Sequence, residues 1–515
     1  MKEKLIEAIQ KSYHTEAAHA FLGCAVFEGE VLPAARLNLN LSMMNRHGLI
    51  AGATGSGKTR TLQLLAEQLS KSGVPVFLSD IKGDLSGMAI PGKTHPKLEQ
   101  RATELGIQYE PSGVPVELYS LSGEKGIPMR ATVMEFGPVL LAKVLELNDT
   151  QTGVLTILFK YADDRAIPVV DLSDVKALLN YLSAGAGKEE IKEDYGSISS
   201  SSAGTILRKI TALEQQGADR IFGEISFKVE DLIRKVDGQG VVSLLNVSDM
   251  QDKPAVFSTF LLSLLAELYE TLPEAGDLDK PKLVFVLDEA HLLFRDASKA
   301  FREQIEQIIR LIRSKGVGVF FCSQMAQDLP DTVLSQLGNR FQHVLRAFTP
   351  DDAKKLRDTV NTYPRSAYYD IAQTLTQMGI GQALITVLNE KGIPTEVAHT
   401  HLVPPVSFMG PLDEPTYQSI VEASEMRAKY AASVDPTSAR EILAAKMGRI
   451  LPGEGVEKPL NEEKEVGTKQ AGPKSAKAEK SVVEQVVNSS LGRSIGREIV
   501  RGIFGMLFGS SKRRR

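Results

Sequence analysis

The stretch GATGSGKT at residues 52–59 restricts the fold of this chain more than any other feature of its sequence. It has the form GxxxxGK[ST], follows the apolar run HGLIA, and precedes TRTLQLLAEQLSKSG, whose apolar residues recur at helical spacing. A glycine-rich loop between a buried strand and a helix turns backbone N–H groups and the helix N-terminus toward phosphate oxygens. The sequence therefore predicts a phosphate-binding loop for a nucleoside triphosphate.

Each residue of this loop is a candidate for nucleotide binding. The candidates are Gly52, Ala53, Thr54, Gly55, Ser56, Gly57, Lys58 and Thr59. We expect Lys58 to reach the β- and γ-phosphates and the Thr59 hydroxyl to ligate magnesium. The expected cofactors are therefore ATP and Mg²⁺.

A second motif, KLVFVLDEAH at 282–291, is an apolar run that ends in two carboxylates. We expect Asp288, at the strand tip, to hold the magnesium and Glu289 to polarise the attacking water as general base. The alternative is a solvated strand end, but the phosphate loop favours catalysis. The letters DEAH also occur in a class of RNA helicases, whose Ser-Ala-Thr motif and arginine pair this chain lacks. We interpret the match as coincidental and expect His291 to start a helix.

Short apolar runs bounded by Gly or Asp predict the strands of a buried sheet. They lie at 47–51, 74–80, 114–120, 241–247, 282–289, 317–324, 341–347 and 382–388. Helical patterns separate most of them, so we read these runs as parallel strands. The predicted fold class is α/β: a RecA-like (ASCE) P-loop ATPase core with a mainly parallel sheet, a helical insertion, and a disordered linker to a basic C-terminal helix.

The predicted organisation follows from shifts in pattern along the chain. Its parts are a short N-terminal segment (1–45), an ATPase domain (46–405) with a helical insertion at about 128–235, C-terminal helices (406–451), a linker (452–480) and a basic amphipathic tail (481–515). Two helices are expected in the fourth part, at 415–432 and 436–448. The linker is polar and mixed in charge, so it cannot bury enough apolar surface to order itself.

Composition adds few constraints on function. The net charge of −4, with 43% hydrophobic and 24% charged residues, is that of a globular protein without a global nucleic-acid footprint. No apolar run of about 18 residues and no apolar signal core is present, so a reduced cytoplasmic setting is the default. In the tail, Arg493, Arg497 and Arg501 share one helical face. Packing on protein, contact with a membrane surface and nonspecific nucleic-acid attachment all stay open for it.

Four segments together resemble the HerA–FtsK superfamily of ring ATPases, and within it the bacterial HerA-like group (YjgR type). They are RHGLIAGATGSGKTRTLQLL, FLSDIKGDLSG, LVFVLDEAHLLF and IRLIRSKGVGVFFCSQMAQDLPDTVLSQLGNRFQHVLRA, in that order and spacing. The resemblance covers about 20–405 and continues into the basic tail. It implies a homo-hexamer that uses ATP to move along double-stranded DNA.

The resemblance also implies roles for residues outside the two motifs. Gln324 matches a sensor glutamine that contacts the lytic water and the γ-phosphate; the alternative is a strand-end amide. Arg313 matches an arginine that reaches the nucleotide of the neighbouring subunit. An arginine supplied in this way, an arginine finger in trans, accelerates hydrolysis. Arg46 matches a second arginine and is expected to bind the nucleotide. For both arginines the alternative is a surface charge. Arg346 matches the arginine that ends a later strand.

Asp80, in SDIKGDLSG, ends a strand at the nucleotide edge of the sheet. It is expected either to join the magnesium network or to form an Asp-Gly turn.

One departure from HerA proteins affects the expected function. Only about 45 residues precede the phosphate loop, too few for the N-terminal β-barrel of HerA, so we expect either a truncated β-element or no barrel. That puts a role in DNA-end resection in doubt. The favoured function is a DNA-dependent ATPase and translocase or helicase. The alternatives are a ring ATPase that acts on protein or at a membrane surface, and an ATPase without a nucleic-acid track.

Overall fold

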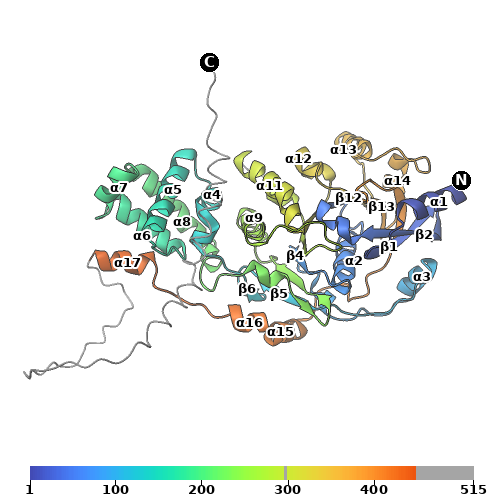
Figure 1. The fold of residues 1–515 in the computed structure, drawn as a ribbon, viewed down its shortest axis with the longest axis horizontal. Helices are drawn as coiled ribbons and strands as arrows, with labels where there is room; N and C mark the ends of the chain where they lie inside the picture. Colours follow the sequence, from blue (N-terminus) through green and yellow to red (C-terminus); the bar gives the residue numbers. More distant parts are fainter. Residues whose placement is uncertain (295–298, 448–515) are drawn as a thin grey trace, which may run out of the picture. The chain divides into compact units, whose positions relative to one another are not determined.

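The computed structural model of the chain describes residues 1–294 and 299–447. These residues form two compact units (Figure 1). The first consists of Met1–Arg130 with Ile225–Ser433, and the second of Ala131–Glu224 with the segment that begins at Val434. The predicted linker (452–480) and basic tail (481–515) lie outside the described residues.

The first unit is built on a 12-stranded sheet in the order β2-β1-β14-β13-β12-β3-β11-β10-β4-β9-β5-β6. Its strands are β1 (His19–Phe27), β2 (Glu30–Asn40), β3 (Gly48–Ala51), β4 (Val76–Asp80), β5 (Val116–Ser120), β6 (Ile127–Pro128), β9 (Val242–Asn246), β10 (Leu283–Leu287), β11 (Val317–Ser323), β12 (Asn339–Gln342), β13 (Gln382–Thr386) and β14 (Ala398–Leu402). A separate hairpin pairs β7 (Lys235–Val236) with β8 (Gln239–Gly240).

The strands from β12 to β6 in this order are parallel, which confirms a mainly parallel α/β sheet. Five residues of β10, Leu283–Leu287, are buried throughout, as are Val317–Ser323 of β11. Strands covered on both faces need apolar side chains on both, which is why they appear in the sequence as continuous apolar runs. Consecutive carboxyl ends of these strands therefore meet at one edge of the sheet.

The other end of the sheet is antiparallel, and here one prediction was wrong. The run at 382–388 forms β13, which pairs antiparallel with both β12 and β14. An apolar run records burial but not strand direction, and the parallel prediction rested on the helical patterns between the runs. Residues 1–45 supply β1 and β2, an antiparallel hairpin that extends this edge through β14.

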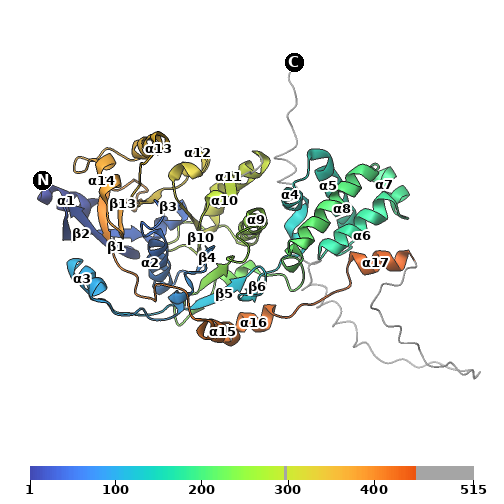
Figure 2. The ribbon, with the colours of Figure 1, turned by 180° about the vertical axis from the view of Figure 1, so that it is seen from behind.

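Eleven helices described in the first unit surround the sheet. They are α1 (Lys2–Ser12), α2 (Lys58–Lys71), α3 (Pro96–Glu104), α9 (Pro254–Thr271), α10 (His291–Phe294), α11 (Lys299–Ile312), α12 (Asp331–Leu334), α13 (Pro350–Asn361), α14 (Ile371–Gln377), α15 (Glu414–Ala423) and α16 (Glu425–Tyr430). As predicted, His291 starts a helix. Helix α9 packs against both α10 and α11 (Figure 2).

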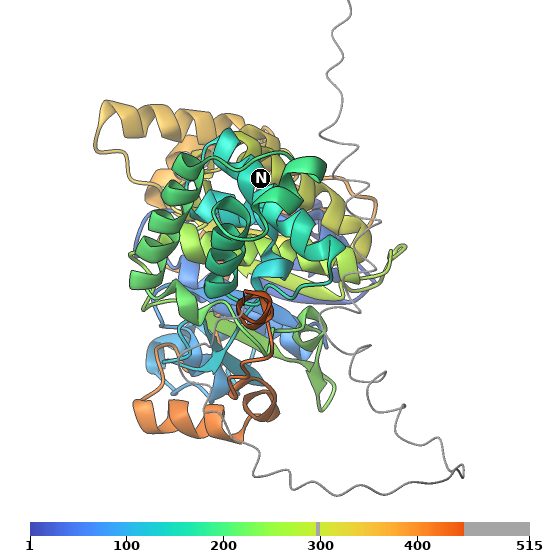
Figure 3. The ribbon, with the colours of Figure 1, turned by 90° about the vertical axis from the view of Figure 1, so that its left-hand side faces the viewer.

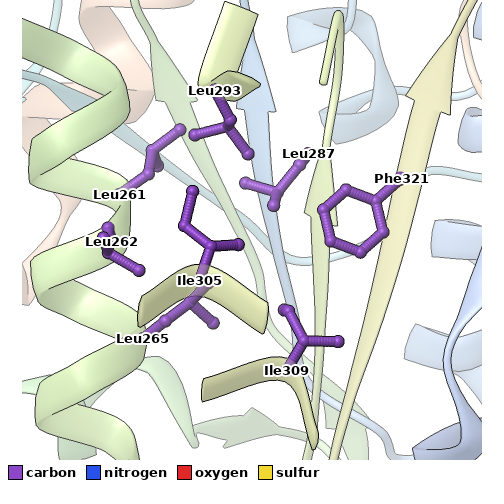
Figure 4. Close-up of a pocket in the computed structure, with 8 residues that line it drawn as sticks. All are labelled: Leu261, Leu262, Leu265, Leu287, Leu293, Ile305, Ile309 and Phe321. Atoms are coloured by element: carbon purple, nitrogen blue, oxygen red, sulfur yellow. The ribbon is translucent and has the colours of Figure 1, made fainter. Parts of the chain in front are cut away.

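These three helices close an apolar core over β10 and β11 (Figure 4). It is lined by Leu261, Leu262, Leu265, Leu287, Leu293, Ile305, Ile309 and Phe321. The packing fixes the two central strands, and with them the residues that follow their carboxyl ends.

The second unit is helical (Figure 3). Its helices are α4 (Val133–Val144), α5 (Asp149–Asp164), α6 (Leu172–Ser183), α7 (Lys188–Asp194), α8 (Ser200–Gln215) and α17 (Ala439–Lys446). Helix α6 contacts α5, α7, α8 and α17. Buried Asp174 ties α17 to this bundle, because its carboxylate accepts hydrogen bonds from the Ser438 hydroxyl (2.6 Å) and the Arg440 amide (2.9 Å). Across the described part of the chain, no helix is long and apolar enough to cross a lipid bilayer.

Candidate nucleotide-hydrolysis site

The predicted phosphate loop connects β3 to α2 at the carboxyl edge of the sheet. Three of its glycines have positive φ: +152° at Gly52, +76° at Gly55 and +109° at Gly57. A Cβ on Gly52 would also lie 2.4 Å from the Cβ of His343, closer than two carbon atoms can approach. The loop conformation therefore depends on glycine at these positions.

Backbone hydrogen bonds attach this loop to the two strands beside β3. The Gly52 amide donates to the Gln324 carbonyl (3.1 Å), just after β11, and the Ala53 amide donates to the Val344 carbonyl (3.0 Å), just after β12. The loop is thus held from both sides.

The Lys58 side chain folds back over the first residues of the phosphate loop. Its Nζ donates to the carbonyls of Gly52 (2.7 Å) and Ala53 (3.2 Å), and the residue is only 8% exposed. Inside the loop, the buried Ser56 hydroxyl has no hydrogen-bond partner among the described residues. An ammonium group and an unpaired hydroxyl in a loop of this shape are suited to phosphate oxygens.

Asp288 and Glu289 follow β10, two strands away from β3 in the sheet. Asp288 is buried, its amide donates to the Ser79 hydroxyl (3.1 Å), and its carboxylate accepts from the Glu289 amide (2.9 Å). Burial, and next the Glu289 charge, raise the pKa of Asp288 to about 6. A bound cation would remove that unfavourable burial of negative charge, so the carboxylate fits the predicted magnesium role.

Glu289 has a strained backbone and an incompletely paired side chain. Its φ of +45° lies in the left-handed region, which is rare for residues other than glycine. One carboxylate oxygen, Oε1, pairs with the Lys82 Nζ at 3.2 Å. The other, Oε2, is buried and lies 3.5 Å from His291 Nδ1, without a hydrogen bond to any described residue. Strain and unpaired polar atoms collect at functional sites.

Two residues that sequence reasoning left without a role contact these carboxylates. The Cys322 thiol is buried and hydrogen-bonds Asp288; burial, and then the Asp288 charge, raise the pKa of Cys322 far above its usual value. In the sequence, Lys82 lies in SDIKGDLSG, the segment that also contains Asp80. The signal that could have found Lys82 is its place after β4, which is paired with β10.

Asp80 folds its own turn. One of its carboxylate oxygens accepts from the Gly83 amide (2.8 Å), and the other accepts from the Leu85 amide (3.0 Å). Burial raises the pKa of Asp80 to about 6. These bonds correspond to the Asp-Gly turn, one of the two roles expected for this residue.

The remaining candidates lie at opposite edges of the sheet. Gln324 directly follows β11, is exposed, and shares the edge of the phosphate loop. Arg313 precedes β11 and Arg46 precedes β3, so both lie at the amino edge. A strand as long as β11 spans about 20 Å at roughly 3.3 Å per residue. Arg313 therefore lies far from the phosphate loop of its own chain, and Arg46 lies at the opposite end of β3 from that loop. Arg346 lies in an exposed segment after β12.

Arg46 and Arg313 are close enough to influence each other. Burial lowers the pKa of Arg313, and the positive charge of Arg46 lowers it further, while Asp277 opposes this. The two positive charges therefore act on each other at this edge of the sheet.

A second support of the loop comes from the segment before β13. The Gly381 amide lies 3.5 Å from the Ser56 carbonyl. Arg101, on α3, donates to the carbonyls of Leu402 (2.8 Å), Ile380 (3.4 Å) and Gly381. One side chain thus fixes three backbone groups beside the phosphate loop.

Comparison with known proteins shows one family and several distant relatives. The family model described as helicase HerA-like C-terminal matches residues 28–514. The DNA double-strand break repair helicase HerA of Sulfolobus acidocaldarius is 23% identical over 70% of this chain and 66% of its own length. The protein of the same name from Saccharolobus solfataricus is 24% identical, over 68% of this chain and 63% of its own. The DNA import protein CedB of Sulfolobus acidocaldarius is 25% identical over 68% of this chain and 51% of its own length. The chain thus spans less than two thirds of the length of each.

Among solved structures, the bacterial conjugative coupling protein TrwB, without its first 70 residues, superposes with a TM-score of 0.51 at 12% identity. The match covers 79% of this chain and 94% of that one. The complex of TrwB with a non-hydrolysable ATP analogue gives a TM-score of 0.50 at 13% identity. That match covers 78% of this chain and 98% of the TrwB chain. At this identity the likeness concerns the fold alone, and it confirms the predicted RecA-like P-loop architecture.

Proposed function

Because the chain belongs to the helicase HerA-like C-terminal family, we propose that it is an ATP-hydrolysing ring motor that moves along double-stranded DNA. The observation that carries this proposal is the convergence at one sheet edge of the phosphate loop, Asp288, Glu289 and Gln324, which follow three neighbouring strands. Sequence segments more than 200 residues apart supply these groups. Convergence of this kind is what hydrolysis of a phosphoanhydride requires.

In the proposed reaction, Lys58 leaves the loop carbonyls and pairs with the β- and γ-phosphates. Thr59 and Asp288 are the residues that would hold a magnesium ion, which would neutralise charge on the phosphates. Glu289 takes the proton of the attacking water, and Gln324 orients that water with its uncharged amide. Each of these groups lies on, or directly after, an element of the central sheet, so its position is set by a rigid scaffold.

We propose that the ring is a homo-hexamer and that Arg313 and Arg46 act on the nucleotide of the neighbouring protomer. Position and charge support this proposal. Both arginines lie at the amino edge of the sheet, opposite their own phosphate loop, and the positive charge of Arg46 acts on Arg313. A triphosphate supplied by the next protomer would relieve the repulsion between them. Arginine in trans is worth about 10³–10⁵ in rate in well-studied NTPases.

DNA as the track is supported by relatives that carry DNA repair or DNA import in their names. The overall charge of −4 gives no further support, so DNA contacts would have to be local. We place the motor in the cytoplasm, where its two buried free thiols, Cys24 and Cys322, would stay reduced.

The experiment is to measure the ATPase rate of the full chain with and without double-stranded DNA, together with the mass of the assembled particle. We expect a hexamer whose ATPase rate rises when DNA is added. An active hexamer indifferent to DNA would favour a protein substrate or an ATPase without a track. A fully active monomer would refute the ring.

A further inference from the structure

Lys82 and Glu289 form an ion pair inside the proposed hydrolysis site. Lys82 Nζ lies 3.2 Å from Glu289 Oε1, with the lysine side chain 48% exposed and the glutamate side chain 11% exposed. Among the described residues, the second carboxylate oxygen of Glu289 has no hydrogen-bond partner. That oxygen lies 3.5 Å from His291 Nδ1, so the ion pair with Lys82 is the shorter of the two side-chain contacts that orient this carboxylate.

The position of Lys82 in the sheet gives that contact a direction. In the order β3-β11-β10-β4, β10 has β11 on one side and β4 on the other. The phosphate loop and Gln324 follow β3 and β11, on the first side. Glu289 follows β10, and Lys82 follows β4. The ion pair therefore draws the carboxylate toward β4, the side of β10 that faces away from β11 and β3.

The turn that carries Lys82 is fixed independently of Glu289. Asp80 accepts hydrogen bonds from the amides of Gly83 and Leu85, and the Gln251 amide group donates to the Ile81 carbonyl at 2.6 Å. The carboxylates of Asp84 and Asp288 also act on the Lys82 ammonium and favour its charged form. The backbone that carries Lys82 is therefore fixed, and the ion pair breaks when either side chain rotates.

We propose that Lys82 is a positioning residue that holds Glu289 in a parked orientation, meaning one directed toward β4 and away from the phosphate loop. Turnover then requires this ion pair to break once nucleotide is bound and the neighbouring protomer has closed on the site. The inference rests on the proposed function, because it takes Glu289 as the general base. Lys82 thus limits hydrolysis in the absence of a track.

The exposure of the pair sets the size of the effect. A half-exposed ion pair is weak, so it biases an orientation without locking it. Removing the ammonium should raise the basal rate about two- to fivefold. The opposite role, in which Lys82 holds Glu289 in its productive position, predicts that the same change lowers the rate.

The test compares steady-state ATP hydrolysis by the full chain and its variants without DNA. We expect Lys82→Met to raise kcat about two- to fivefold with little change in KM, and to reduce the further stimulation by DNA. Lys82→Arg, which keeps the charge, should return the rate toward that of the unmodified chain. Lys391→Met, in an exposed turn before β14, is the matched control for losing a surface lysine.

Two further variants separate this inference from the proposed function. If Glu289→Gln hydrolyses ATP normally, the general-base assignment fails and the inference fails with it. If Glu289→Gln is inactive but Lys82→Met has an unchanged or lower kcat, with normal thermal unfolding and normal binding of a fluorescent ATP analogue, the parked orientation alone is refuted. If Lys82→Met accelerates hydrolysis, adding Glu289→Gln to it should abolish the gain. A gain that survives in the double variant would also overturn the inference.

Discussion

The backbone carbonyl of Gln324 accepts a 3.1 Å hydrogen bond from the amide of Gly52, so the end of β11 is joined to the first glycine of the phosphate loop. The Gln324 side chain is exposed beside this junction. A change at the phosphates can therefore reach β11 through Gln324, the residue proposed to orient the attacking water. β11 in turn begins a few residues after Arg313, at the opposite edge of the sheet.

Gln324→Ala should lower kcat about 10- to 100-fold and leave the affinity for ATP nearly unchanged. The side chain would act in the transition state through its amide, whereas the backbone bond to Gly52 does not depend on it. Steady-state hydrolysis and equilibrium binding of a fluorescent ATP analogue measure the two quantities. Gln336→Ala, in the partly exposed turn after α12, is the control. Equal losses in binding and rate would instead indicate a strand-end amide that supports the loop.

Glu289→Gln should bind ATP and fail to turn it over. The amide keeps the shape of the side chain but cannot accept the proton of the attacking water. Single-turnover hydrolysis should fall by at least about 10²-fold, within the usual contribution of a general base. Lys58→Ala is the contrasting variant, because it should lose binding itself. Persistent turnover in Glu289→Gln would remove Glu289 from its proposed role.

Arg313→Ala and Lys58→Ala should each be inactive alone and partly active when mixed. Lys58→Ala damages the phosphate loop of a protomer, while Arg313→Ala damages what that protomer gives to its neighbour. Mixed rings then contain some interfaces with both groups intact. ATPase activity across a series of mixing ratios measures this, and the same series with Arg46→Ala tests the second arginine. Mixtures without recovered activity would contradict action in trans.

Arg101→Ala should weaken nucleotide binding although the side chain lies outside the phosphate loop. Loss of the guanidinium leaves the carbonyls of Leu402, Ile380 and Gly381 without their charged donor. Removing such a donor costs about 1–3 kcal/mol. Calorimetric binding of ADP and thermal unfolding should both show the loss, whereas Arg427→Ala, exposed on α16, should show neither. Normal ADP affinity in Arg101→Ala would separate this segment from the site.

His47 should make the fold sensitive to acid. It is 2% exposed; Nε2 lies 2.7 Å from the Ile309 carbonyl and Nδ1 accepts from the Val319 amide (3.0 Å), so the ring fits only when neutral. Burial lowers the pKa of His47 from 6.5 to about 4. Between these two pKa values His47 is protonated in the unfolded chain and neutral in the folded chain. The free energy of unfolding therefore falls as pH drops from about 6.5 toward 4.

At pH 5 this single histidine should lower the free energy of unfolding by about 2 kcal/mol. Urea unfolding at pH 7 and pH 5 measures the loss, and His47→Gln should reduce it relative to the unmodified chain. Comparison of the variant with the unmodified chain cancels the contributions of other groups. His14→Gln, at an exposed position, should keep the full loss. An unchanged pH dependence in His47→Gln would refute this cause.

The two nucleotide motifs and the buried parallel strands were determined by sequence because each depends on local pattern. A glycine loop needs glycine where φ is positive, as at Gly52 and Gly57, and a strand buried on both faces must be continuously apolar, as in β10 and β11. Asp288 and Glu289 could be placed at a strand tip for the same reason. These constraints act within about ten residues, so they can be read without knowing the rest of the fold.

The strand order, the direction of β13 and the partners of Glu289 were decided only by the tertiary structure. Pairing between β4 and β10 brings Lys82 to Glu289 across 207 residues of sequence, and no local pattern encodes that pairing. The same holds for Arg46 beside Arg313 and for Arg101 beside the phosphate loop. Which charges meet depends on how strands and helices pack over long separations, and that is a property of the whole sheet and its core.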